Sequence, residues 1–276
     1  MKRTLHLLII DPQNDFCDLP AGYVPASESP ALPVPGAHAD MQRVAGLIEQ
    51  GGTGLSGISI TLDSHHRRDV AHPAFWEGVS PFTEITARDV ADGKFLPRDP
   101  DALPRVTDYL RQLEANGRYT LMVWPTHCEI GSWGHNVHAD VRAAYNVWEE
   151  RNLASVGKII KGTNPWTEHY SAIEAEVPDE SDPATQTNTA MIALLAGADQ
   201  VYITGEAGSH CVRATTEHLV AHWDPQQLAR LVLVTDCMSA VAGFEGRFRD
   251  FLGEMQARGL TLATSGDVLA ELRANA

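Results

Sequence analysis

Short, unbroken apolar runs alternate with amphipathic stretches along this chain, and this alternation limits the folds open to it. The clearest runs are residues 5–10, 58–62, 201–204 and 231–235. A strand with one solvated face alternates apolar and polar residues, whereas an unbroken run suits a strand covered on both faces of a parallel sheet. Because helical patterns separate the runs, we predict a single α/β domain over residues 1–276.

The remaining elements are predicted from the same periodicities. Further strands are predicted at 119–124, 158–161 and 260–263, and helices at 39–50, 101–116, 137–150, 187–196, from 212 onward, at 244–258 and at 267–274. Residues 17–36 and 64–100 show no periodicity and are predicted to be loop excursions from the domain. Long loops of this kind in compact domains are usually functional or disordered.

Charge and cysteine usage exclude several classes of partner. The formal net charge is −15, which repels nucleic acid and anionic membrane surfaces, so neither is expected as a partner. The four cysteines match no zinc-finger spacing and no disulfide framework. The apolar run near the N-terminus is too short for a signal peptide, and no stretch reaches the length of a membrane span. We therefore predict a cytoplasmic protein with reduced thiols.

Polar side chains with catalytic chemistry follow the predicted strands. In parallel sheets, sites form where the carboxyl ends of the strands meet at one edge. The residues expected at that edge are Asp11, Asp63, His65, His127, Lys161 and Cys211.

Cys211 lies in a strand–turn–helix pattern over residues 201–212, where it would occupy the first turn of the helix. Free backbone N–H groups and the positive end of the helix dipole favour a thiolate at such a position. The neighbouring His210 would point about 100° away on a helix and is poorly placed as a base. Asp11 and Lys161 are better partners, since a carboxylate can move the proton and a cation favours the thiolate. A buried structural thiol is the alternative.

A second set of residues has the composition of a metal site. Asp63 and His65 are two residues apart at a strand end and would leave it on the same face. With His127 they would form a set of one carboxylate and two histidines, and His72 is a candidate fourth ligand. Such a set suits Zn²⁺, Mn²⁺ or Fe²⁺ with open positions.

Taken together, these segments resemble the isochorismatase-like cysteine hydrolases, and among them the nicotinamidases. The resemblance is carried, in family order, by five segments: Ile10-Asp-Pro-Gln-Asn-Asp-Phe-Cys17, Thr61-Leu-Asp-Ser-His65, Trp124-Pro-Thr-His-Cys128, Lys161-Gly162 and the turn from Gly205 to Val212. Several features depart from the family pattern. Glu206 stands where the family usually has an apolar residue, and residues 77–118 and 17–36 lengthen the chain. The metal motif reads Asp-Ser-His-His-Arg-Arg, and the spacing from His65 to His72 is looser than in the family.

The resemblance implies a Rossmann-like fold with a central, mostly parallel six-stranded sheet flanked by helices, usually in a homo-oligomer. It also implies roles for individual residues. These are a catalytic triad of Asp11, Lys161 and Cys211, a cis peptide bond between Glu206 and Ala207, an oxyanion hole formed by the backbone N–H groups of Ala207 and Cys211, a ring pocket lined by Phe16 and Trp124, and a divalent metal, zinc first, on Asp63, His65 and His127 with His72.

The activity that this resemblance implies is hydrolysis of the C–N bond of a small amide, with nicotinamide as the first candidate. Cys211 would form a thioester, and the products would be nicotinate and ammonia. Three alternatives remain open at this stage. They are a metal-independent cysteine amidase for another amide, ureido or carbamoyl compound, an isochorismatase-type hydrolase that does not require the cysteine, and a non-catalytic α/β binding protein.

Overall fold

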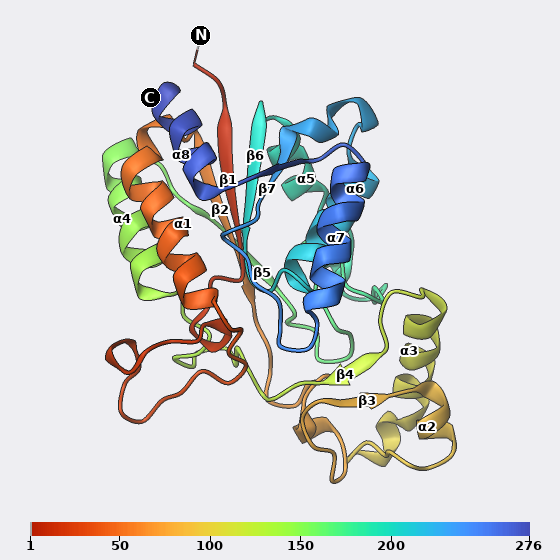
Figure 1. The fold of residues 1–276 in the computed structure, drawn as a ribbon. Helices are drawn as coiled ribbons and strands as arrows, with labels where there is room; N and C mark the ends of the chain where they lie inside the picture. Colours follow the sequence, from red (N-terminus) through yellow and green to blue (C-terminus); the bar gives the residue numbers. More distant parts are fainter. Residues whose placement is uncertain (1) are drawn as a thin grey trace.

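The computed structural model describes residues 2–276, which form a parallel sheet with helices on both faces (Figure 1). The sheet has six strands in the order β5-β2-β1-β6-β7-β8, and every neighbouring pair is parallel. The strands are β1 (Leu5–Ile10), β2 (Gly57–Asp63), β5 (Gly157–Lys161), β6 (Gln200–Gly205), β7 (Leu231–Val234) and β8 (Thr261–Ala263). The prediction of a six-stranded parallel α/β sheet is confirmed. Every residue of β1, β7 and the predicted run in β6 is buried, which explains the unbroken apolar sequences.

Two layers of helices cover the sheet. One face is covered by α1 (Ala37–Gly51), α4 (Ala139–Asn152) and α8 (Ser265–Ala274), and the other by α5 (Thr189–Ala196), α6 (Cys211–His222) and α7 (Glu245–Ala257) (Figure 1). The observed bounds lie within about two residues of most predicted ones. Within residues 2–276, no helix is long and apolar enough to cross a membrane.

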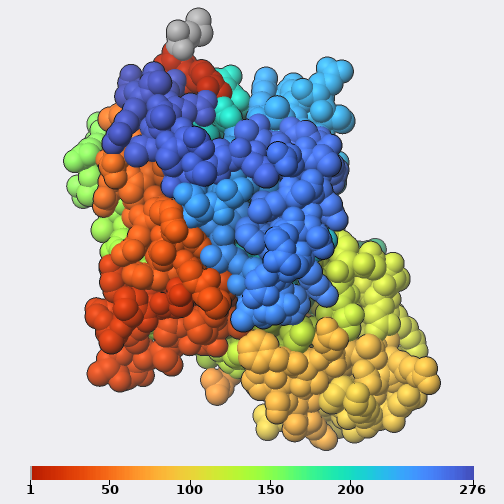
Figure 2. Space-filling model, viewed as in Figure 1, coloured from red at the N-terminus to blue at the C-terminus, as the bar shows by residue number. Residues whose placement is uncertain are grey.

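A lobe that lies outside the central sheet shows that two predictions, for residues 119–124 and 64–100, were wrong. Strand β4 (Leu121–Val123), predicted as a member of the central sheet, instead pairs antiparallel with β3 (Thr83–Ile85) in a separate two-stranded sheet. Both β3 and α2 (Ala87–Ala91) lie inside the 64–100 stretch, where only loop was predicted. With α3 (Leu103–Ala115) they form the gold to yellow-green lobe at the lower right of Figure 2.

The α2 helix was missed because it is short, yet its N-terminus carries a local signal. Thr86 accepts a hydrogen bond from the backbone N–H of Asp89, and the Asp89 carboxylate accepts one from the N–H of Thr86. This reciprocal capping satisfies backbone donors that a short helix would otherwise leave free.

The register of the sheet places polar residues at its carboxyl edge. Asp63 of β2 is directly opposite Lys161 of β5, and Ile10 of β1 is opposite Gly205 of β6. The chain leaves β6 through Gly205, which has φ +113° and no room for a side chain, because a Cβ would lie 2.0 Å from the carbonyl oxygen of Ile10. Only glycine fits such a position. Asp11 and the turn before Cys211 therefore emerge side by side.

Candidate active site

Asp11, Lys161 and Cys211 meet at this edge of the sheet, all of them buried. The Lys161 ammonium has three acceptors, one for each hydrogen: Oδ1 of Asp63 at 2.8 Å, the carbonyl oxygen of His169 at 3.0 Å and Sγ of Cys211 at 3.6 Å. Oδ2 of Asp11 lies 3.0 Å from Lys161 Nζ but accepts no well-aligned hydrogen bond from the described residues. Its lone pairs remain free for the thiol proton of Cys211.

The Asp11 carboxylate is fixed by a residue that the sequence interpretation did not single out. Thr61 accepts a hydrogen bond from the Asp11 N–H at 3.0 Å and donates its hydroxyl to Asp11 Oδ1 at 2.5 Å. One oxygen of the carboxylate is thereby held, and the other is directed to Lys161 and Cys211. Burial raises the pKa of Asp11, against the opposing charge of Lys161. A raised pKa brings a carboxylate closer to the range in which it exchanges protons at neutral pH.

The protonation of Cys211 differs from the sequence expectation. Cys211 is the first residue of α6, as predicted, but burial raises the pKa of its thiol, and Lys161 only partly offsets this. The nearby carboxylates of Asp11 and Asp63 raise the pKa further. Burial and two anions therefore outweigh the helix dipole and one cation. The resting residue is a thiol, and its proton has to move to a base as it reacts.

Two backbone donors beside Cys211 have no acceptor. The peptide bond between Glu206 and Ala207 is cis, as the family resemblance implied. The N–H groups of Ala207 and Cys211 donate to none of the described residues, whereas those of Glu206, Gly208 and His210 all have backbone acceptors. A pair of free, fixed N–H groups next to a nucleophile is the arrangement that stabilises an oxyanion.

The residues expected to bind a metal also lie together. His65, His72 and His127 are buried, and each offers a ring nitrogen within 4.8 Å of those of the other two. Asp63 Oδ2 lies 3.0 Å from Nε2 of His65 and 3.4 Å from Nε2 of His127. The structure thus brings the predicted Asp63, His65 and His127 together, and places His72 beside them, with its Nε2 3.2 Å from Nδ1 of His127.

The far side of two of these imidazoles is held by acceptors. Nδ1 of His65 lies 3.1 Å from Asp69 Oδ2, and Nδ1 of His127 lies 2.8 Å from the carbonyl oxygen of Pro125. A ring N–H that donates to such a partner leaves the opposite Nε2 lone pair available. Asp69 was missed by the sequence interpretation, although it lies four residues after His65 in the same loop.

A narrow pocket with a cavity volume of about 20 Å³ lies against Cys211. Both predicted ring-pocket residues, Phe16 and Trp124, line it. The remaining lining residues, several of which the sequence interpretation missed, are Leu32, Asp63, His127, Glu168, Tyr170, Ala207, His210 and Val241. The pocket therefore joins Cys211 and Ala207 to Asp63 and His127, two members of the metal-type cluster formed by Asp63, His65, His72 and His127.

His210 faces this pocket as a neutral imidazole. Burial lowers its pKa to about 3. Its Nδ1 lies 2.9 Å from Oγ of Ser209, which itself accepts a hydrogen bond from the N–H of Val241. Nδ1 of His210 is thus engaged with Ser209, and the lowered pKa keeps the imidazole neutral beside Cys211.

Two further acidic residues near the site, Glu168 and Glu206, differ in whether they line the pocket. Glu168 lines the pocket, one of its carboxyl oxygens has no partner, and burial raises its pKa. Glu206 does not line the pocket, although it directly precedes Ala207. Its carboxyl group points behind the turn, where the N–H of Ser239 donates to Oε2 at 3.2 Å. The Glu206 carboxyl group therefore does not face the pocket.

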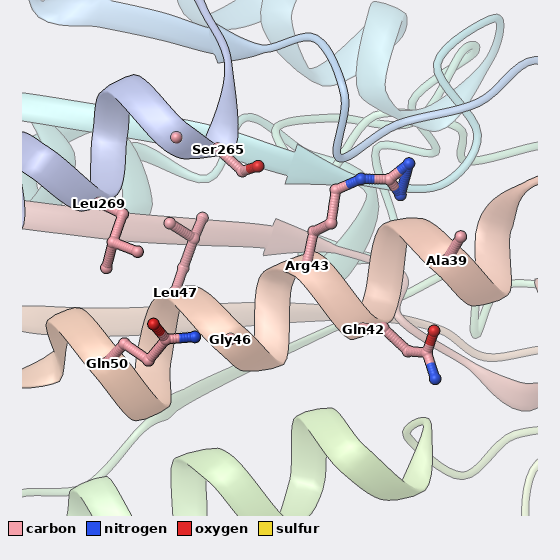
Figure 3. Close-up of a pocket in the computed structure, with 9 residues that line it drawn as sticks. Ala39, Gln42, Arg43, Gly46, Leu47, Gln50, Ser265 and Leu269 are labelled. Atoms are coloured by element: carbon pink, nitrogen blue, oxygen red, sulfur yellow. The ribbon is translucent and has the colours of Figure 1, made fainter.

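Another hollow, of about 440 Å³, lies between α1 and α8. Figure 3 shows Leu47 of α1 and Leu269 of α8 pointing toward each other across it, with Arg43 and Ser265 nearby. None of the residues that line it is a cysteine, a histidine or a carboxylate. The chemistry of the chain is concentrated in the pocket at Cys211.

Comparisons with solved structures agree with this fold. A nicotinamidase/pyrazinamidase from Acinetobacter baumanii matches with a TM-score of 0.65 and 21% identity, over 96% of this chain and 98% of that one. A pyrazinamidase of Pyrococcus horikoshii in complex with zinc matches with a TM-score of 0.56 and 21% identity, over 94% of this chain and 98% of that one. An isochorismatase family protein from Desulfovibrio vulgaris matches with a TM-score of 0.55 and 19% identity, over 99% of both chains.

No protein-family model matches the sequence, and no curated protein does either. The structural likeness nevertheless extends over nearly the whole chain, although the sequence identities are only 19–21%. The chain has the isochorismatase-like α/β fold that these hydrolases share.

Proposed function

We propose that this protein is a cysteine amidohydrolase that releases ammonia from a small aromatic amide, with nicotinamide as the first substrate to test. One observation carries the proposal: the thiol of Cys211 lies beside the Lys161 ammonium, a carboxylate oxygen of Asp11 with no aligned donor and two free N–H donors. Cys211 and Ala207 also line the pocket. The nicotinamidase and pyrazinamidase names of the structural neighbours support the choice of amide.

Thioester formation would begin with transfer of the Cys211 proton to Asp11. The sulfur attacks the amide carbon, and the new oxyanion accepts hydrogen bonds from the N–H groups of Ala207 and Cys211. Collapse of this intermediate breaks the C–N bond while Asp11 returns the proton to the leaving nitrogen. Ammonia departs, and the acyl group remains on Cys211 as a thioester. Lys161 keeps the charge of the site balanced while the proton is on Asp11.

Hydrolysis of the thioester would use the same groups in reverse order. A water molecule attacks the acyl carbon, Asp11 accepts one of its protons, and the same N–H pair stabilises the second oxyanion. The C–S bond then breaks, the carboxylic acid leaves, and Asp11 returns the proton to the Cys211 sulfur. Each two-donor oxyanion site of this kind lowers a barrier by several kcal/mol, because loss of one donor alone costs about 3–4 kcal/mol.

The metal-type cluster fits a divalent cation. Asp63, His65 and His127, with His72, form a buried set of one carboxylate and three imidazoles, and two ring N–H groups already have outer acceptors. This donor set suits zinc, and Mn²⁺ or Fe²⁺ are the alternatives. When bound, the cation supplies a Lewis-acid site at the wall of the substrate pocket, where a ring nitrogen could be held. Asp63 and His127 line that wall.

We expect purified protein to contain close to one equivalent of a divalent metal, and chelation to lower ammonia release from nicotinamide by at least ten-fold. The measurement is elemental analysis of the protein, followed by ammonia release from a panel of small amides before and after chelator. Restoring Zn²⁺, Mn²⁺ or Fe²⁺ separately would identify the metal that supports turnover. Protein that carries no metal and hydrolyses another amide equally well with chelator would be a metal-independent amidase.

A further inference from the structure

Glu206 has an environment that the proposed reaction does not use. It is fully buried behind the turn that presents Ala207, and its Oε1 has no hydrogen-bond partner among atoms of the described residues. The titratable and charged groups that influence it are Asp40 of α1, Asp18 and Cys17 from the segment before α1, and Cys237 after β7. A carboxylate buried among carboxylates needs a proton or a cation to be stable.

Ser239 connects Glu206 to Asp40. The Ser239 N–H donates to Glu206 Oε2 at 3.2 Å, and its hydroxyl donates to Asp40 Oδ2 at 2.5 Å. The other Asp40 oxygen lies 3.3 Å from Nη1 of Arg43, the α1 side chain drawn in Figure 3. Both oxygens of Asp40 therefore act as acceptors, as expected of an ionised carboxylate.

The proton of this pair consequently belongs on Glu206. Both carboxyl groups bind Ser239, and burial raises the pKa of each. If Glu206 is the neutral acid, its unpartnered Oε1 becomes a donor to Asp40, and no buried oxygen is left unsatisfied.

This acid–carboxylate pair joins three segments. The turn after β6 is also tied to Ser239 through the Gly208 N–H, which donates to the Ser239 carbonyl oxygen at 2.7 Å. Asp40 belongs to α1, whose start is held by the Asp18 carboxylate, which accepts from the Gly36 and His38 N–H groups at 2.8 Å. We propose that Glu206 is a positioning residue, which acts as a neutral acid and fastens the turn carrying the Ala207 N–H to α1. This role rests on the proposed function of that N–H as an oxyanion donor.

The test compares Glu206→Gln, which keeps a neutral donor and acceptor, with Glu206→Ala, which removes both. We expect Glu206→Gln to retain kcat within about two-fold. Glu206→Ala should lose about ten-fold in kcat with KM nearly unchanged. This loss is a fraction of the loss caused by deleting an oxyanion donor. Because the neutral acid is the functional form, wild-type kcat should fall as pH rises through the elevated pKa of Glu206. Glu206→Gln should lack this alkaline decline. Glu49→Gln, on the exposed side of α1, is the control for loss of a carboxylate.

Two substrate-free measurements separate this proposal from the proposed function. Carboxyl ¹³C NMR of glutamate-labelled protein should show one group, absent in Glu206→Gln, that titrates well above the ordinary glutamate value of about 4.3. The alkylation rate of Cys211 by iodoacetamide should change in Glu206→Ala and not in Glu206→Gln. An ordinary titration of Glu206, or equal effects of both substitutions, would overturn the positioning role. If the NMR and alkylation results are as expected but the protein has no amidase activity, only the proposed function is refuted.

Discussion

Replacing Cys211 by alanine is expected to lower kcat for ammonia release by about 10⁵-fold, by analogy with the loss of a nucleophile from a catalytic triad. The proposed reaction passes through a thioester on this sulfur, and no second thiol is available at the pocket, since Cys211 is the one cysteine that lines it. The measurement is steady-state ammonia release at saturating nicotinamide, with thermal unfolding to confirm that the variant is folded. Cys237→Ala is the matched control, because Cys237 is also buried but lies outside the pocket.

The partners of Cys211 sharpen this prediction. Asp11→Ala and Lys161→Ala are each expected to abolish measurable turnover, because Asp11 is the only proposed base and Lys161 contacts both Asp11 and Cys211. Groups that act as a unit give strongly non-additive losses. The Cys211→Ala/Asp11→Ala double variant should therefore be no slower than either single variant. Full activity in Cys211→Ala would instead indicate an isochorismatase-type reaction that needs no thiol.

The four inner strands β2, β1, β6 and β7 could be predicted because nearly all of their residues are buried. The run 5–10 was predicted with the observed bounds of β1, and 58–62 lies inside β2. Burial on two sides leaves a continuous apolar signal in the sequence. The same logic placed Asp11, Lys161 and Cys211 at one edge, since parallel strands end together there.

Pairing partners were harder to predict than strands. The sequence Leu121-Met-Val123 has the same local character whether it joins the central sheet or the small one, and its partner β3 has only three residues. His127 consequently reaches the metal-type cluster from a segment outside the main sheet. It lies beside Asp63 and His65, but the expected route through a central strand was wrong.

The electrostatics of the site could not be predicted from local sequence either. The position of Cys211 at a helix start favours a thiolate, but the pKa depends on burial and on Asp11 and Asp63, which are far away in the chain. The direction of the Glu206 side chain likewise depends on Ser239 and Asp40. Both corrections concern long-range neighbours, which short motifs do not specify.

Asp63 is the residue through which the triad and the metal-type cluster are connected, so Asp63→Asn should also have a large effect. Oδ1 of Asp63 contacts Lys161 Nζ at 2.8 Å, and Oδ2 faces His65 at 3.0 Å and His127 at 3.4 Å. An asparagine keeps the shape, but its NH₂ group must face either the ammonium or the imidazoles. We expect loss of bound metal and a fall in kcat of about 10³-fold. The free energy of unfolding should decrease by about 3 kcal/mol. This is the lower end of the range for breaking a buried ion pair, because Lys161 still pairs with Asp11.

Asp69→Asn is the comparison that separates the two roles of Asp63. Asp69 lies 3.1 Å from Nδ1 of His65, and has no ion pair with Lys161. Loss of such an outer partner typically weakens metal binding by about 10–100-fold. Excess metal should therefore restore kcat in Asp69→Asn, but not in Asp63→Asn, where the contact with Lys161 is also lost. If excess metal restored both variants equally, the contact between Asp63 and Lys161 would have no part in catalysis, and the cluster and the triad would be independent sites that share one wall of the pocket.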